Sequence, residues 1–253
     1  MAQPQDSRHD QVLAIDIGAT AIKFCRTDDR GALLEVPRRR PTPYPCTPER
    51  LIDLLSERIR RSKCPRVGVG FPGEFAEGHV VRPGNLSRPG GVTTETDPVL
   101  DRQWRNFAFE EALRQATGRN VRVVNDATLA ALGCCEGVGA ELVLSLGTGL
   151  GLALCVDGSL RKVRDVGAEV FLDGRTYDQV LGERSRSEDQ AVWQSMLELA
   201  VGRFVKEFGA TIVHLAGGNA RRVAPDSFTA LSCRVVIEGN EAALHGAARL
   251  FYN

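Results

Sequence analysis

Short apolar runs that end on glycine and polar residues recur along the chain, and they predict strands joined by tight turns. Residues 12–25 hold two such runs on either side of a Gly-Ala-Thr turn, which predicts a β-hairpin. Residues 31–45 begin apolar and become rich in proline, which favours an edge strand that leaves into a loop. Residues 66–75 form a further apolar run and predict a buried strand that ends on a Pro-Gly pair.

Two segments in the first half have the period of an amphipathic helix. In residues 48–62 apolar positions recur every three or four residues, as expected when one face packs on a core. Thr47 stands in front of a proline, a typical N-cap followed by a favoured first helical residue. Residues 101–117 show a similar period and predict a second helix.

A second series of strands and helices follows, and it again contains a hairpin with glycine in its turn. The predicted elements are a strand at 120–126, a helix at 127–134, a hairpin at 140–158, a helix at 188–208, strands at 210–220 and 234–240, and a last helix at 241–252. We therefore expect two α/β lobes, residues 1–118 and 119–253, with the last helix able to pack back on the first lobe.

Composition narrows the class of protein. The 32 basic and 32 acidic residues cancel, so no field for nucleic acid or an anionic membrane is expected, and the run Arg38-Arg39-Arg40 is most simply a solvated turn. No segment resembles a signal peptide or a spanning helix. The seven cysteines are odd in number and lie mostly in apolar runs, which indicates reduced thiols and a cytoplasmic location. Because Cys134 and Cys135 are adjacent and no Cys-x-x-Cys occurs, no zinc site is expected.

Three glycine-rich turns carry candidate binding chemistry. The first spans Asp16 to Thr20 and the second Gly147 to Gly151, each inside a hairpin and each with a threonine. Glycine lets successive backbone N–H groups face one concavity, which suits phosphate oxygens, but glycine also marks ordinary hairpins. The third turn, Gly217-Gly218-Asn219, could admit a nucleotide base or ribose, or simply connect a strand to a helix. The P-loop sequence and the dinucleotide fingerprint are both absent.

One acid stands where a predicted strand ends and a helix begins. Phosphoryl transfer to an alcohol needs a base beside the attacking hydroxyl, and the Asp126 carboxylate is suitably placed for that role. Asn125 or Asp126 would equally be a good N-cap for the following helix. The two interpretations are compatible, because a capped acid keeps a fixed direction.

Six motifs, in order, make the chain resemble the ROK family of bacterial sugar kinases, within the superfamily of sugar kinases, heat-shock ATPases and actin. They are AIDIGATAIK, VGVGFPGEF, VRVVNDATLAALG, LSLGTGLGLALCVDGSL, DGRTYDQVLGE and HLAGGNA. The resemblance covers residues 12–250 and is strongest to the polyphosphate glucokinase branch, which also lacks the zinc-binding cysteines of many members. It implies an α/β, two-lobed actin-like ATPase fold of the ribonuclease H type, with a cleft between the lobes.

The resemblance also implies roles for single residues. Asp126 would be the catalytic base, and Asp16, otherwise a turn-capping acid, would hold Mg²⁺. The sugar would contact Asn125 and Asn85, although Asn85 could equally be a turn asparagine. The phosphates or the nucleotide of the donor would be bound by Gly18, Thr20, Lys23, Gly147, Thr148, Gly149, Gly217, Gly218 and Asn219.

The family pattern fails at one segment of the sugar site. Members carry Glu-Leu-Gly-His after the second hairpin, whereas this chain reads DVGAEV, with Asp165 for the Glu and Ala168 for the His. Asp165 is one methylene shorter and Ala168 cannot hydrogen-bond, while Glu169 could reach in. A lost hydrogen bond costs about 1–3 kcal/mol when its partner stays unpaired, so we expect an altered sugar pocket. Ala19 also replaces a turn glycine, which is tolerable if its φ stays negative.

Two classes of function follow. The first is a kinase that uses Mg²⁺ and transfers a phosphoryl group from ATP or polyphosphate to a hexose, glucose-like at the 6-hydroxyl, or to a different or amino sugar. The second is a catalytically weak, kinase-like regulatory protein that binds sugar or nucleotide. Relatives suggest a homodimer, with no nucleic acid or membrane partner. A polyphosphate donor would favour a basic groove, with candidates Arg161, Lys162, Arg164, Arg184 and Arg186.

Overall fold

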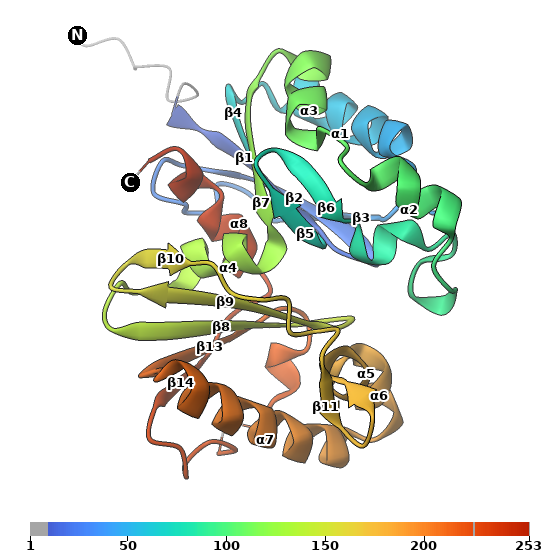
Figure 1. The fold of residues 1–253 in the computed structure, drawn as a ribbon. Coiled ribbons are helices and arrows are strands. Elements are labelled where there is room, and N and C mark those ends of the chain that lie inside the picture. The colour runs from blue at the N-terminus through green and yellow to red at the C-terminus, as the bar shows by residue number, and fades with distance from the viewer. Residues whose placement is uncertain (1–9, 225, 253) are drawn as a thin grey trace, which may run out of the picture. The chain divides into compact units, whose positions relative to one another are not determined.

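The computed structural model describes residues 10–224 and 226–252, and these divide into two compact units (Figure 1). Unit 1 holds residues 10–133 and 243–252, and unit 2 holds the residues between them. The lobe boundary predicted after residue 118 precedes strand β7 (Asn120–Asn125), which nevertheless pairs with the sheet of unit 1. A hydrogen-bonded ladder therefore keeps this strand with the first unit.

The core of unit 1 is a five-stranded sheet in the order β3-β2-β1-β4-β7. The hairpin and the edge strand predicted at its start are both present, and the later strands run parallel to the first. All six residues of the central strand β1 are buried, as expected for a strand covered on both faces. The strands are β1 (Val12–Ile17), β2 (Ala21–Thr27), β3 (Arg38–Pro41), β4 (Arg66–Phe71) and β7.

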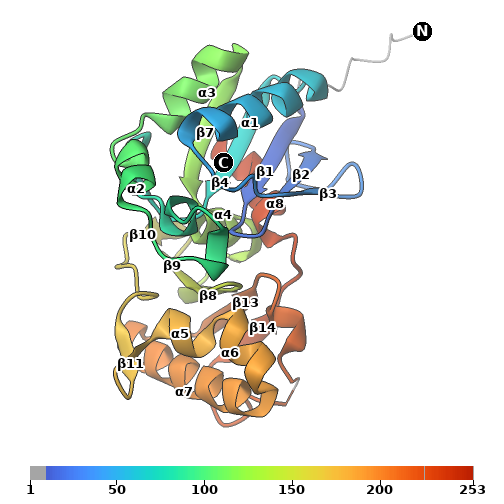
Figure 2. The same cartoon turned by 90° about the vertical axis from the view of Figure 1, so that its right-hand side faces the viewer.

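Helix α1 (Pro48–Ser62) begins and ends where the sequence predicts it. The Thr47 hydroxyl accepts a hydrogen bond from the N–H of Arg50 at 3.2 Å, and Lys63 ends the helix with a left-handed φ of 60°. Leu51, Leu55 and other apolar residues of α1 are buried against the sheet. Figures 1 and 2 show α1 beside α3 on one face of this sheet, with α4 and α8 on the other.

The single helix predicted over residues 101–117 is wrong, because the chain breaks it into α2 (Pro98–Trp104) and α3 (Phe109–Thr117). Asn106 adopts a left-handed φ of 58° at the break. Its N–H donates to the carbonyl of Val80 at 2.8 Å, and the Val80 N–H donates to Phe107 at 3.1 Å. The break thus exchanges helical hydrogen bonds for pairing with strand β6 (His79–Arg82), which pairs in turn with β5 (Glu74–Ala76).

The predicted last helix is shorter than expected. It consists of α8 (Ala242–Gly246) followed by one turn of 3-10 helix (Ala248–Leu250). Gly246 lies so close to α4 (Asp126–Cys134) that an added Cβ would stand 1.9 Å from the carbonyl oxygen of Leu129. His245 Nδ1 lies 2.9 Å from the carbonyl oxygen of Gly31. These contacts attach the chain end to unit 1.

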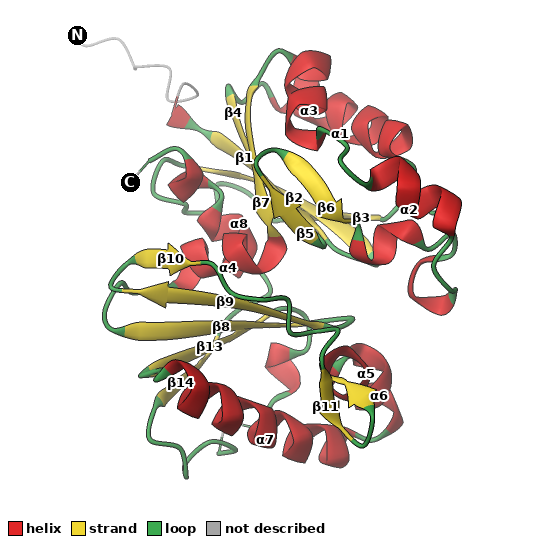
Figure 3. Ribbon diagram, in the orientation of Figure 1, coloured by secondary structure: helices red, strands yellow, loops and turns green. Residues whose placement is uncertain are grey.

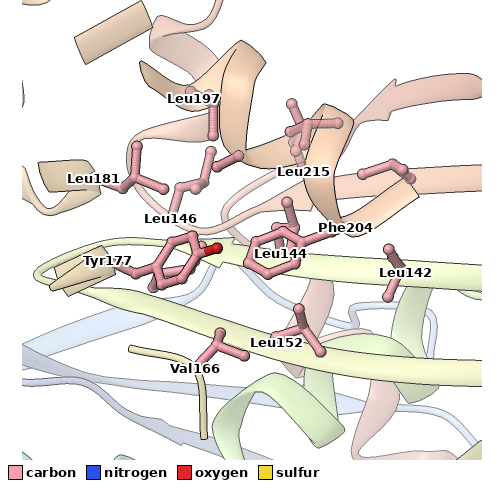
Figure 4. Close-up of a cluster of buried hydrophobic side chains, with 14 of the residues drawn as sticks. Leu142, Leu144, Leu146, Leu152, Val166, Tyr177, Leu181, Leu197, Phe204 and Leu215 are labelled. Carbon is pink, nitrogen blue, oxygen red and sulfur yellow. The ribbon is translucent and has the colours of Figure 1, made fainter. Parts of the chain in front are cut away.

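Unit 2 repeats the arrangement with a second five-stranded sheet, in the order β10-β9-β8-β13-β14. Figures 3 and 4 show the long helix α7 (Gln190–Phe208) along one face of this sheet, with Phe204, Tyr177 and Leu144 packed between. Asp189 caps α7 by accepting from two backbone N–H groups. The other elements are β8 (Ala140–Leu146), β9 (Leu150–Val156), β10 (Ser159–Arg161), β11 (Val170–Leu172), β12 (Arg175–Thr176), α5 (Tyr177–Leu181), α6 (Glu183–Glu188), β13 (Ile212–Ala216) and β14 (Arg234–Ile237).

All seven cysteines are free thiols, in agreement with the predicted reduced state.

Among the helices of the described residues, none combines the length and the apolar character needed to cross a membrane.

A buried polar network joins three strands of unit 2. His214 on β13 lies 2.9 Å from Glu141 on β8 and 2.8 Å from Glu238 beyond β14. Burial alone would raise the pKa of Glu141, but three backbone N–H groups and His214 hold it below its ordinary 4.5. The ionised carboxylate therefore stabilises the folded state at neutral pH.

We expect Glu141→Gln to lower the free energy of unfolding by about 3 kcal/mol at pH 7, because an amide NH₂ replaces one of the two oxygens that accept hydrogen bonds from the N–H groups of residues 136, 137 and 138. Urea unfolding of the full chain measures this loss, and the exposed Glu136→Gln is the control. The difference between wild type and Glu141→Gln should shrink as the pH falls from 4.5, the ordinary pKa that applies to the unfolded chain, through the lower pKa of the folded carboxyl. An equal stability of the two variants at pH 7 would contradict the assigned network.

Candidate active site

The first glycine turn joins β1 to β2 and is tied down from the loop after β3. The Gly18 N–H donates to Ala21 at 3.0 Å across the turn. The Thr42 hydroxyl donates to the Gly18 carbonyl, and the Tyr44 hydroxyl to that of Ala19, both at 2.7 Å. Ala19 is absent from the non-glycine residues with positive φ among those described, so the replacement of a glycine there causes no backbone strain.

Asp16 and Lys23 face each other across the hairpin that carries this turn. They are paired in the register of β1 and β2, and Lys23 Nζ donates to Asp16 Oδ2 at 2.7 Å. Both side chains are more than four-fifths buried, so this ion pair is only weakly screened by solvent. Lys23, predicted to bind phosphate, is thus already bound to the predicted metal ligand.

The residues around Asp16 fit a magnesium ion bound mainly through water and phosphate. Mg²⁺ commonly takes one or two protein carboxylates and fills its remaining positions with water and substrate oxygens. Asp16 supplies one carboxylate on a buried strand, and only its Oδ2 has a hydrogen-bond partner within the described part of the chain. Asp16 would hold the ion, whose chemistry is to neutralise charge on a phosphoryl group.

Asp126 is the first residue of α4, directly after the end of β7. One of its oxygens accepts a hydrogen bond from the Ala127 N–H at 2.8 Å. Burial, and then the negative charge of Asp16, raise the pKa of Asp126 to about 7, against the opposing effects of the backbone N–H groups and Lys23. The carboxyl group can therefore exchange a proton near neutral pH.

Asn125 holds the start of α4 in place. Its side-chain oxygen accepts from the N–H groups of Ala127 at 2.9 Å and Thr128 at 3.2 Å, which makes it the N-cap. Its amide nitrogen donates to the carbonyl of Gly73 at 2.7 Å, which leaves one N–H for another acceptor. A contact between Asn125 and a sugar hydroxyl stays a prediction.

The segment that contains Asn85 meets the same loop. Asn85 lies in a 3-10 turn (Gly84–Ser87), and its side chain is half-buried. Gly84 packs against the carbonyl oxygen of Pro72, which an added Cβ would approach to 2.5 Å. The Pro72-Gly73 loop therefore lies against both the Asn85 turn and Asn125, and it brings these candidate sugar-binding residues of unit 1 into one region.

The second glycine turn, between β8 and β9, is held by hydrogen bonds from Glu183 and Asn219. The Gly147 carbonyl accepts from the N–H of Glu183 at 2.9 Å and from the side chain of Asn219 at 3.1 Å. Asn219 also accepts from Arg186 Nε at 3.1 Å, and its own N–H donates to Leu146. The side chain of Asn219 thus supports the turn of Gly147 and Thr148, while a contact with nucleotide stays a prediction.

Asp178 on α5 is a turn-holding residue to which the sequence analysis gave no role. Its Oδ1 accepts from the Leu150 N–H at 2.7 Å, and an added Cβ on Gly149 would stand 2.2 Å from the same oxygen. Its position inside the motif DGRTYDQVLGE was the available signal. Thr42 and Tyr44, by contrast, lie outside every motif used to identify the turns.

The segment that departs from the family pattern is largely at the surface. Ala168 and Asp165 are exposed, and Asp165 accepts from the N–H of Gly167 at 3.2 Å. Glu169 pairs with Arg164 at 2.7 Å, and Arg164 also pairs with Glu207. Glu169 would have to exchange this partner to reach a sugar, so its predicted role as a replacement ligand stays a prediction.

Two further candidate sites consist of groups that already have partners. Three of the five cations considered for a polyphosphate groove are paired with acids, and so is His214, which lies beside Cys134 and Cys135. Arg164, Arg184 and Arg186 each have a glutamate partner. Cys134 and Cys135 each lie near His214 with a glutamate, a set that could hold a metal ion, but both ring nitrogens of His214 already contact carboxylates. The absence of zinc stays a prediction.

Comparison with known proteins places this set of turns and acids in a family. The model of the ROK family matches residues 12–167, which is more than half of the chain. The chain belongs to the ROK family. A glucokinase of Halalkalibacterium halodurans is 25% identical over 162 residues, 58% of this ROK chain and 44% of its own length. The aligned region thus spans less than half of that relative.

Solved structures extend the similarity over nearly the whole ROK chain. An inorganic polyphosphate/ATP-glucomannokinase from Arthrobacter sp. strain KM is 28% identical, with a TM-score of 0.77 and coverage of 95% of this chain and 97% of that one. A ROK family glucokinase from Streptomyces griseus, in complex with glucose and AMPPNP, is 17% identical, with a TM-score of 0.68 and coverage of 95% and 98%. The fold is the actin-like ATPase fold that the motifs predicted.

We expect Gly217→Ala to destabilise the ROK protein by about 3 kcal/mol, while Gly218→Ala has little effect. Gly217 has a φ of 89°, and an added Cβ would stand 2.5 Å from the carbonyl oxygen of Leu146. An added Cβ on Gly218 would have nothing within 4 Å, and Gly218 does not have positive φ. Urea unfolding of both variants measures the difference. Equal loss in the two would show that the packing on Leu146 is not limiting.

Proposed function

We propose that this ROK protein is a sugar kinase that transfers a phosphoryl group from ATP or polyphosphate to a hexose hydroxyl. The observation that carries the proposal is Asp126, an acid directly after the end of strand β7 whose pKa is raised to about 7. A general base works best when its pKa lies near the operating pH. Asp16 lies in the same unit, and its negative charge contributes to the raised pKa of Asp126.

In the proposed reaction Asp126 takes the proton of the sugar hydroxyl as that oxygen attacks the terminal phosphorus of the donor. The bond from phosphorus to the donor's bridging oxygen breaks, and the shortened donor leaves with the bonding electron pair. Asn125 fixes the backbone from which Asp126 projects, because it caps α4 and binds Gly73. The backbone N–H groups of the turns at Gly18 and Gly147 are proposed to bind the donor phosphates.

The substrate classes rest on the relatives. The Arthrobacter protein is an inorganic polyphosphate/ATP-glucomannokinase. Its 28% identity over nearly the full chain supports polyphosphate and ATP as the donors here. The matching glucokinase supports glucose as the acceptor. Ala168, which is exposed and lacks a hydrogen-bonding group, favours a difference in sugar preference, such as a larger or amino-substituted hexose.

The competing function is a catalytically weak regulatory protein of the same fold, and Ala168 is the observation that favours it. A regulatory protein needs no base with a pKa near 7, so the raised pKa of Asp126 favours the kinase function. We retain a homodimer and a cytoplasmic location as predictions of the family resemblance.

Asp126→Asn should reduce sugar phosphorylation by at least about 10²-fold, since the base is lost while its shape is kept. A coupled assay with a panel of hexoses, run with ATP and with polyphosphate, measures turnover. Asp97→Asn is the matched control, because Asp97 caps α2 in the same unit by accepting from Val99. Binding of sugar or nucleotide without turnover in the wild-type protein would favour the regulatory function.

The pH dependence of wild-type kcat/KM should follow the Asp126 carboxyl. The base is active when ionised, so the rate should rise with pH and level off above a midpoint of about 7. In the metal-free protein, Asp16→Asn should move the titration of Asp126, followed by NMR, to lower pH, because a negative neighbour is removed. An unchanged midpoint in that variant would show that the two acids are not coupled.

A further inference from the structure

A cluster of basic side chains lies at the edge strand of unit 1. Two adjoining hollows, of about 350 and 200 Å³, lie between strand β3, the end of β2 and the C-terminal half of α1. We call their shared surface the arginine groove. Its cations are Arg26, Arg38, Arg39, Arg40, Arg58, Arg61 and Lys63, and its acids are Glu35 and Glu57.

Most of these cations have no acidic partner. Glu35 pairs with Arg26 and Glu57 pairs with Arg61. Arg58 lies over the ring of Phe24, 5.8 Å from its centroid. Within the described ranges no carboxylate lies within ion-pair distance of Arg38, Arg39, Arg40 or Lys63, and β3 is exposed along its whole length. The groove therefore gathers a positive charge in a chain whose formal net charge is zero.

Two ordinary explanations account for part of this charge. Basic residues near the end of α1 complement its dipole, and charged residues on an edge strand discourage pairing with other sheets. Neither explains why both sets line one hollow. Arg38 and Arg40 pair in register with Phe24 and Ile22, so they stand on the face of the sheet against which α1 packs. The two sets of cations thus converge.

The groove is continuous with the first glycine turn through the backbone of β3. Thr42, directly after β3, donates its hydroxyl to Gly18 and its N–H to Thr20. At the usual rise of a strand, Arg40 lies about 7 Å and Arg38 about 13 Å along the chain from Thr42. Arg40 and Arg38 therefore occupy successive positions on one face of β3, between the turn and the hollows.

We propose that the arginine groove binds a chain of linked phosphates, as in inorganic polyphosphate. Guanidinium groups bind phosphate oxygens in bidentate geometry, and a row of them suits a regularly charged chain. Single-stranded nucleic acid is disfavoured, because its binding sites use exposed aromatic rings for base stacking. The one aromatic residue of the groove, Phe24, is 1% exposed and is covered by Arg58.

Binding is tested by calorimetry on the full chain with tripolyphosphate and with long-chain polyphosphate. The variant Arg38→Gln/Arg40→Gln/Lys63→Gln removes three groove cations. The control Arg30→Gln/Arg102→Gln/Arg175→Gln removes three exposed arginines elsewhere. We expect the groove variant to bind long-chain polyphosphate at least tenfold more weakly than the control, and to lose part of the salt dependence. Circular dichroism and urea unfolding verify that both variants fold.

Equal affinity of the two variants, or no binding by the wild type, would overturn the proposal. An equal tenfold loss for polyglutamate would overturn its restriction to phosphate.

Measurements of turnover then distinguish whether the bound polyphosphate is the donor or a separate effector. Only these kinetic measurements rest on the proposed function. A raised KM for polyphosphate with unchanged ATP kinetics identifies the anchored tail of the donor. A polyphosphate effect on ATP-driven turnover that disappears in the variant identifies a separate effector. Both results support the groove, and a chain with no kinase activity still reports the binding.

Discussion

The burial of the Asp126 carboxyl group, together with its repulsion by Asp16, is the constraint on which the candidate active site depends. A buried acid is costly when ionised, and a second acid nearby increases that cost. The protein offsets it with Lys23, which binds Asp16, and with backbone N–H groups at the start of α4. These contacts leave the pKa of Asp126 near 7, so the site keeps an acid that is neither permanently charged nor permanently protonated.

The turns of the site are held mostly by side chains from elsewhere in the chain, which bind backbone groups of the turns. The first turn depends on Thr42 and Tyr44, more than twenty positions away, and the second on Asp178 and Asn219. Each uses a side chain to bind a peptide group of the turn. The peptide groups that remain are then held in a fixed direction before any ligand arrives, which reduces the ordering cost of binding.

Hydrophobic periodicity and glycine position predicted the hairpins, α1 and the alternation of elements, because those signals are local. They could not predict the break at Asn106, where pairing with Val80 across the fold overrides a helical pattern. The residues that fasten the turns were missed for the same reason, since a threonine or tyrosine in a loop carries no local mark of its distant partner. The run Arg38-Arg39-Arg40 was interpreted as a solvated turn, and only its pairing with β2 and its approach to α1 show a concave cationic surface.

The coupling of Asp16 to Asp126 has a reciprocal consequence. Because the charge of Asp16 makes Asp126 harder to ionise, a cation held at Asp16 would make Asp126 easier to ionise. Thermodynamic linkage then requires that ionised Asp126 strengthens the affinity for that cation by the same factor by which the cation favours ionisation. Cation uptake should accordingly expel a fraction of a proton into neutral buffer. The binding of a cation by unit 1 would thus be measurable as acid released into the solution.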